Sequence, residues 1–99
     1  MEFVGLLVRK LEFTNGNGAH GVWRMATYLL ETIESFPKHM VVKVFDGLSG
    51  RIALFDALIG KNVTVYFDIN AKEGKDNRFY NDITAFGIKS NEPEPPKNE

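Results

Sequence analysis

Hydrophobic and polar residues alternate most regularly over residues 61–70. The odd-numbered positions from 63 to 69 are Val, Val, Phe and Ile, whereas the even-numbered positions from 64 to 70 are polar or aromatic. This period of two predicts a strand with one buried face. A second strand pattern at residues 78–89 follows the polar segment 72–77, so the two strands are expected to form an antiparallel hairpin.

Two further strands and a helix are predicted in the first sixty residues. Residues 2–13 form an apolar run interrupted by Gly5, which predicts a long strand that bends or bulges at that glycine. The β-branched run at 41–45 predicts another strand. Residues 47–60 predict a short helix, with Ser49 as its cap and Gly60 at its end. Its apolar positions recur at helical spacing: Ile52, Phe55, Leu58 and Ile59.

The segment at residues 22–36 is ambiguous, because its apolar residues also fall at helical spacing. It follows the stretch NGNGAHG at 15–21, which from Gly16 onward spells G-x-G-x-x-G. A strand, a glycine loop and a helix are the context in which that pattern binds a dinucleotide pyrophosphate. The alternative is a hairpin loop in which Asn-Gly pairs supply positive φ angles.

The rest of the chain favours the hairpin loop. A dinucleotide fold continues with parallel, fully apolar strands, whereas the last two predicted strands alternate and are joined by a short polar turn. An acid about 20 residues further on should hold the ribose hydroxyls; Asp46, at the end of a predicted strand, is the candidate, but it lies 30 residues past Gly16. Nucleotide binding at 16–21 therefore remains a minor alternative, and no cofactor is expected.

Composition indicates one small globular domain. The 99 residues are 43% hydrophobic and 25% charged, with a net charge of −1. Residues 90–99 include three prolines and three acids, so a disordered tail is expected after a domain at 1–89. The remaining chain carries a formal charge of +1, which argues against a strongly basic surface and leaves only local basic patches.

Several function classes lack support in the sequence. There is no cysteine, hence no disulfide or thiolate nucleophile, and no catalytic motif is present. His20 and His39 have no ligand-like spacing, so no metal site is expected. No secretory start and no apolar run of about 20 residues is visible. We therefore expect a non-catalytic, cytoplasmic protein without membrane contact.

Five strands with a helix between the third and fourth is the order of an OB-fold, a Greek-key barrel. Six local stretches resemble a small family of bacterial and phage OB domains similar to single-stranded-DNA-binding proteins, catalogued largely as a domain of unknown function. They extend the resemblance over about residues 2–89. The stretches are Trp23, residues 28–32, Phe36-Pro37, Phe45-Asp46, residues 65–69, and Phe79-Tyr80 followed by Asp82-Ile83.

The resemblance implies that residues 22–32 are the second strand and that the glycine stretch joins strands one and two. The family tends to carry more bases along strand two and near the end of strand five. This sequence has Met25 and Thr27 in the first place, and Thr84 and Gly87 in the second.

Single-stranded nucleic acid needs flat rings for its bases and cations for its phosphates. Alternation places Met40, Val42 and Val44 in the core, which leaves residues 39, 41, 43 and 45 facing outward. We take the Trp23 side of strand two as the open side, with the charged end of Arg24 in solvent at the groove mouth. Phe79 and Tyr80 alternate, so one of the two is expected in the core. The candidate nucleic-acid-binding residues are Trp23, Arg24, His39, Lys43, Phe45, Lys72, Lys75, Arg78 and Tyr80.

Two functions follow as hypotheses. The first is non-catalytic binding of single-stranded DNA, or RNA, by base stacking and phosphate contacts in replication, repair or recombination. The second is an OB-fold protein-interaction or assembly module, because exposed rings such as Trp23, Phe45 and Tyr66 equally suit a subunit contact. A homo-oligomer, dimer or tetramer, is expected in either case.

Overall fold

The alternating segment near the C-terminal end forms the hairpin that its pattern predicts. In the computed structural model, which describes residues 1–19, 21–47 and 50–92, β4 (Asn62–Glu73) pairs antiparallel with β5 (Phe79–Ser90). Val63, Val65 and Phe67 point into the core, as alternation requires. The connection is Gly74 followed by a short 3₁₀ turn, Lys75–Asn77. The predicted polar turn is therefore confirmed.

The ambiguous segment is a strand. β1 (Glu2–Gly18) and β2 (Gly21–Glu31) form a long hairpin, and β2 also pairs with β3 (His39–Asp46). Ala26, Tyr28 and Leu30 are fully buried by this pairing. Pairing on both edges satisfies the backbone of β2, so tertiary structure overrides the helical spacing of its apolar residues.

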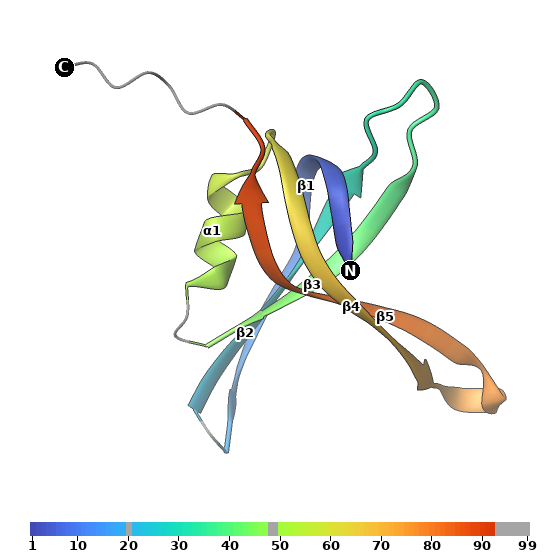
Figure 1. Cartoon of the computed structure of the whole chain (residues 1–99). Helices are drawn as coiled ribbons and strands as arrows, with labels where there is room; N and C mark the ends of the chain where they lie inside the picture. The colour runs from blue at the N-terminus through green and yellow to red at the C-terminus, as the bar shows by residue number, and fades with distance from the viewer. Residues whose placement is uncertain (20, 48–49, 93–99) are drawn as a thin grey trace.

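The strands close into a barrel in the order β1-β2-β3-β5-β4 (Figure 1). Closure depends on β1, whose first residues pair with β4 and whose remainder pairs with β2. β3 and β5 meet in a short parallel contact, Lys43 with Thr84 and Val44 with Ala85. Within the described residues this is the predicted OB-fold: five strands, with α1 (Arg51–Ala57) between β3 and β4.

The core fills the inside of this barrel. It combines inward residues from all five strands with two residues of α1. Its members are Leu7, Ala26, Tyr28, Leu30, Val42, Val44, Ile52, Phe55, Val63, Val65, Phe67 and Ala85.

The glycines of β1 do not act as predicted. The register shifts lie between Leu7 and Arg9 and between Lys10 and Glu12, not at Gly5. Gly5 is needed for close approach, because a Cβ there would collide with the Glu31 carbonyl. The glycine stretch does not end the strand either: residues 15–18 are extended and paired, and among the described residues of 15–21 only Gly21 has a positive φ, 109°.

Helix α1 is shorter than the predicted residues 47–60. Ser49 lies outside the described residues, and the carboxylate of Asp46 serves the first turn. It accepts hydrogen bonds from the backbone N–H groups of Gly50 (3.2 Å) and Ile52 (2.9 Å). The helix ends at Ala57, and Gly60 lies beyond it at φ 88°, where its N–H donates to the Leu7 carbonyl at 2.7 Å.

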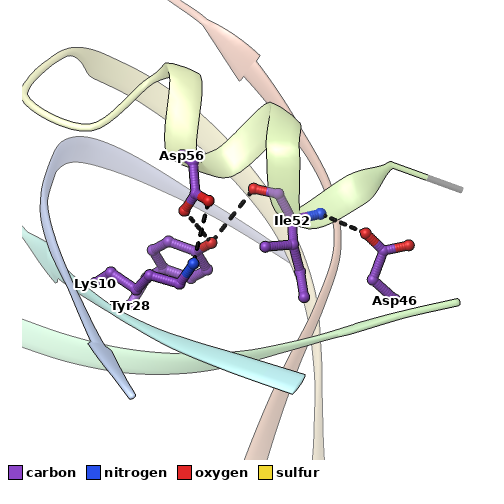
Figure 2. A network of polar contacts seen from close by, with 5 residues as sticks. All are labelled: Lys10, Tyr28, Asp46, Ile52 and Asp56. Carbon is purple, nitrogen blue, oxygen red and sulfur yellow. Dashed lines mark hydrogen bonds and ion pairs between the residues drawn. The ribbon is translucent and has the colours of Figure 1, made fainter. Parts of the chain in front are cut away.

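A buried tyrosine ties α1 to the barrel (Figure 2). The Tyr28 hydroxyl donates to Asp56 Oδ1 at 2.7 Å, and Lys10 Nζ lies 3.1 Å from Asp56 Oδ2. The Tyr28 ring also packs on Phe55, with centroids 5.1 Å apart. Burial, reinforced by the hydrogen bond to Asp56, raises the pKa of the Tyr28 hydroxyl above its ordinary value.

Tyr28→Phe is expected to lower the free energy of unfolding by about 1.5–3 kcal/mol at pH 7, because it removes a hydrogen bond to a charged group while keeping the ring. A raised pKa contributes stability below the unfolded value near 10 and loses it as pH rises further. The difference in free energy of unfolding between wild type and Tyr28→Phe, measured in urea, should therefore be smaller above pH 10 than at pH 7. A difference that stays constant or increases with pH would contradict the hydrogen bond from Tyr28 to Asp56.

The C-terminal end of β5 is fastened to β4. The Asn91 side chain donates to the Thr64 hydroxyl at 2.7 Å, and its backbone N–H donates to the Asn62 carbonyl at 2.8 Å. Residues 90–92, part of the predicted tail, thus contact the barrel, and residues 93–99 lie outside the described residues. The division into a domain at 1–89 and a disordered tail remains a prediction. Among the described residues, no helix is long and apolar enough to cross a membrane.

Candidate nucleic-acid interface

Two hairpins extend beyond the barrel and flank the outer face of β2 and β3. Figure 1 shows the β1–β2 hairpin and the β4–β5 hairpin projecting in different directions, and β3 pairs with both β2 and β5. On the outer face, cross-strand pairs place Met25 beside Phe45 and Thr27 beside Lys43. We call the surface formed by Trp23, Met25, Thr27, Lys43 and Phe45 the outer groove. The outward positions predicted for β3 are confirmed, because Val42 and Val44 are buried whereas Val41 and Phe45 are exposed.

Trp23 lies at the β1–β2 end of the outer groove, where its indole ring packs against Gly16 and Gly18 of β1. It pairs directly with Gly16, where an added Cβ would come within 2.6 Å of the indole ring; at Gly18 the corresponding distance is 3.5 Å. The missing side chain at position 16 therefore lets the indole lie against the backbone of β1. The Trp23 side chain remains 42% exposed, and Phe45, its diagonal neighbour, is 45% exposed.

A charged cluster lies at the other end, where β3 meets the β4–β5 hairpin. Lys43 Nζ is 2.8 Å from Asp82 Oδ1, and Lys72 Nζ is 3.1 Å from Asp82 Oδ2. The Asp82 side chain is only 12% exposed. The hydrogen bonds from Lys43 and Lys72 hold the pKa of the Asp82 carboxyl below its ordinary value, so the carboxylate stays charged near neutral pH.

This cluster borders a pocket of about 430 Å³ under the β4–β5 hairpin. The pocket combines one face of the sheet with the inner side of the hairpin. It is lined by Thr27, Val41, Lys43, Lys72, Glu73, Gly74, Tyr80, Asn81, Asp82 and Ile83. Three predicted residues, Lys43, Lys72 and Tyr80, are thus brought together.

The expectation that Phe79 or Tyr80 lies in the core is wrong. Both are exposed, at 68% and 56%, because the β4–β5 hairpin continues past the barrel and has no core beneath it. The Tyr80 ring lies against Gly74, where an added Cβ would collide with it. An aromatic ring on a glycine thus recurs on both hairpins that flank the outer groove.

Four predicted site residues lie apart from these two ends. Arg24 is exposed as expected, but alternation along β2 turns it to the side opposite Trp23. His39 lies at the far end of β3, with Nε2 3.1 Å from the carboxylate of Glu31. Lys75 and Arg78 are exposed at the tip of the β4–β5 hairpin.

Asp82 and Thr27 line the pocket but were not among the predicted site residues. The position of Asp82 beside Lys43 depends on the parallel contact of β3 with β5, residues about forty apart in sequence, and no local pattern reports that contact. Asp46, considered as a ribose-binding acid, caps α1 instead.

The structure offers no support for a dinucleotide loop, since the segment after the glycines is a strand paired antiparallel with β1. In the part of the chain that the structure describes, no group of three or more His, Asp or Glu side chains could hold a metal ion. His20 lies outside the described residues.

Comparison with solved structures supports the fold. The mitochondrial single-stranded DNA binding protein Rim1 of S. cerevisiae superposes with a TM-score of 0.67 at 18% identity, over 95% of this chain and 96% of that one. A small single-stranded DNA-binding protein from Streptomyces coelicolor gives 0.52 at 14% identity, over 92% and 90%. No curated protein sequence matches the chain.

The family model described as Domain of unknown function (DUF3127) matches residues 2–89. The resemblance stated from the sequence is therefore confirmed, and this protein, an OB-fold chain similar in structure to small single-stranded-DNA-binding proteins, belongs to the DUF3127 family.

Proposed function

We propose that this protein binds single-stranded DNA non-catalytically, along the outer groove of β2 and β3. The observation that carries the proposal is a pair of exposed aromatic rings, Trp23 and Phe45, on the same sheet face as Lys43. The proteins of similar fold are named for binding single-stranded DNA, which supports the same ligand here.

The rings suit unpaired bases. Trp23 has its indole against glycine backbone and is still 42% exposed, so a base can stack on it without moving the strand. Phe45 continues the platform along β3, and Tyr80 offers a ring on the opposite hairpin. A base stacked on such a ring contributes about 1–3 kcal/mol, and nearly any base serves.

The cations suit the backbone of the strand. Lys43 of β3 and Lys72 of β4 line the pocket. Lys75 and Arg78 are exposed at the tip of the β4–β5 hairpin. Phosphate contacts made by such residues release counterions, so affinity should fall as salt rises. The protein's net charge of −1 makes these local contacts, rather than a general basic surface, the source of attraction.

The test is fluorescence of Trp23, the only tryptophan, titrated with poly-dT at low and high salt. We expect saturable quenching at low salt and weaker binding at high salt. Duplex DNA of the same length is the control, because its bases are not available for stacking. No quenching at either salt would remove the stacking proposal.

The alternative is a protein-interaction or assembly module using the same rings. It is favoured by the carboxylates beside three of the predicted phosphate-binding residues: Glu31 beside His39, and Asp82 beside Lys43 and Lys72. A sizing column separates the two proposals. An oligomer that persists in Trp23→Ala leaves that ring for DNA, whereas its loss assigns the ring to a subunit interface. A cytoplasmic dimer or tetramer remains part of either proposal, and RNA remains an alternative ligand for the first.

A further inference from the structure

The pocket under the β4–β5 hairpin already contains an anion, and it belongs to the protein. Each carboxylate oxygen of Asp82 meets a different ammonium group, Lys43 at 2.8 Å and Lys72 at 3.1 Å. The three residues come from β5, β3 and β4, so the carboxylate lies where three strands meet. A carboxylate bridging two ammonium groups has the charge and acceptor pattern of a phosphodiester with its two free oxygens.

We propose that Asp82 competes with nucleic-acid phosphate for Lys43 and Lys72 and thereby limits the affinity of the outer groove for single strands. This inference rests on the proposed function and assigns a role within that site. A phosphate reaching both lysines must displace the carboxylate or bind beside it, and binding beside it brings two negative charges together.

The arrangement differs from an ordinary surface ion pair in two respects. Asp82 is 12% exposed, so water screens it less than it screens the lysines, which are 42% and 63% exposed. Asp82 also binds two lysines at once, one on each carboxylate oxygen, and these hydrogen bonds lower the pKa of its carboxyl. The lysines are thus held together in the pocket, but with one of their two charges neutralised.

This neutralisation has a measurable consequence in the salt dependence of binding. Each phosphate that a free lysine contacts adds about 0.7 to the slope of log affinity against log salt for a single strand. A lysine that stays with the Asp82 carboxylate neutralises no phosphate and therefore releases no counterion from the DNA. Asp82 should therefore make the wild-type slope shallower than its count of lysines suggests.

The experiment compares wild type with Asp82→Asn, using anisotropy of a labelled dT oligonucleotide over a series of salt concentrations. Asparagine keeps the size and one acceptor but removes the charge. We expect about tenfold tighter binding at low salt, the order of change typical of one hydrogen bond to a charged group. We also expect the slope to steepen by roughly 0.7–1.4, for one or two phosphates.

Asp68→Asn is the matched control. Asp68 is an exposed carboxylate on the same sheet face, where it pairs with Thr84, and it makes none of the ion pairs found among the described residues. The Asp68→Asn substitution changes the net charge of the protein by the same amount as Asp82→Asn. Its effect on affinity should stay within about twofold, as expected for a screened surface charge.

A second comparison tests whether the effect passes through the lysines. In a Lys43→Gln, Lys72→Gln background, Asp82→Asn should no longer tighten binding, because the groups for which it competes are gone. Thermal unfolding of each variant checks that the fold persists.

The outcomes separate this inference from the proposed function. If wild type binds and Asp82→Asn binds equally or more weakly, Asp82 positions the lysines rather than competing for them, and the inference is overturned while the function stands. If neither protein binds at any salt, both are overturned. A gain that survives in the lysine-free background, or that Asp68→Asn reproduces, also overturns the inference.

Discussion

Phe55→Ala is expected to lower the free energy of unfolding by about 3–5 kcal/mol, the cost of truncating a fully buried phenylalanine. Phe55 is completely buried, packs on Tyr28 and is one of two residues that α1 contributes to the core. Because small domains have about 5–15 kcal/mol in total, this loss is a large share of the stability. Urea denaturation followed by circular dichroism measures the change.

Leu54→Ala is the control, since Leu54 is the neighbouring residue of the same helix and is 57% exposed. Its effect should stay within about 0.5 kcal/mol. A Phe55→Ala variant as stable as Leu54→Ala would mean that α1 is not part of the cooperative core.

Trp23→Ala is expected to weaken single-stranded DNA binding by roughly 5- to 150-fold, which corresponds to the 1–3 kcal/mol of one stacked base. The indole is exposed on the outer groove and makes no contribution to the core cluster, so stability should change little. Anisotropy of a labelled dT oligonucleotide measures the affinity without relying on the tryptophan. Val22→Ala, at an exposed neighbour on the opposite side of β2, should leave the affinity unchanged.

A substitution at Gly16, beneath the indole ring, tests independently whether stacking on Trp23 contributes to binding. Gly16→Val places a Cβ 2.6 Å from the present position of the indole, so the ring must move. Binding should weaken although Trp23 itself is retained. Gly18→Ala, whose Cβ would lie at an ordinary 3.5 Å, is its control. Full affinity in both Trp23→Ala and Gly16→Val would refute stacking on this ring.

Local pattern predicted the strands with one buried face. In β3 and β4 the inward positions recur every second residue, because only one face of each strand meets the core. It failed for β2, whose apolar residues also have helical spacing, and the correct assignment came from the family resemblance. It failed again at Phe79 and Tyr80, since alternation cannot tell where a hairpin leaves the barrel.

Some residues of the candidate site could be predicted from the sequence, and others could not. The outward positions of Phe45 and Lys43 were predicted from alternation within β3, whereas that of Trp23 was predicted only after the resemblance made residues 22–32 a strand. Arg24 and His39 were predicted to lie near phosphates, but alternation already turns Arg24 away from Trp23, and the partner of His39 depends on the neighbouring strand. Arg24 lies on the opposite side of β2, and His39 is beside Glu31.

The sequence by itself determined the strand periodicity, the small helix with its apolar face, and the absence of cysteine chemistry, because these are properties of residues close together in the chain. Only the tertiary structure decided that Gly16 supports Trp23, that Asp46 caps α1, and that Asp82 joins Lys43 to Lys72. These contacts depend on strand register and on the parallel meeting of β3 with β5. Register is fixed by burial across the whole barrel, which no short window of sequence contains.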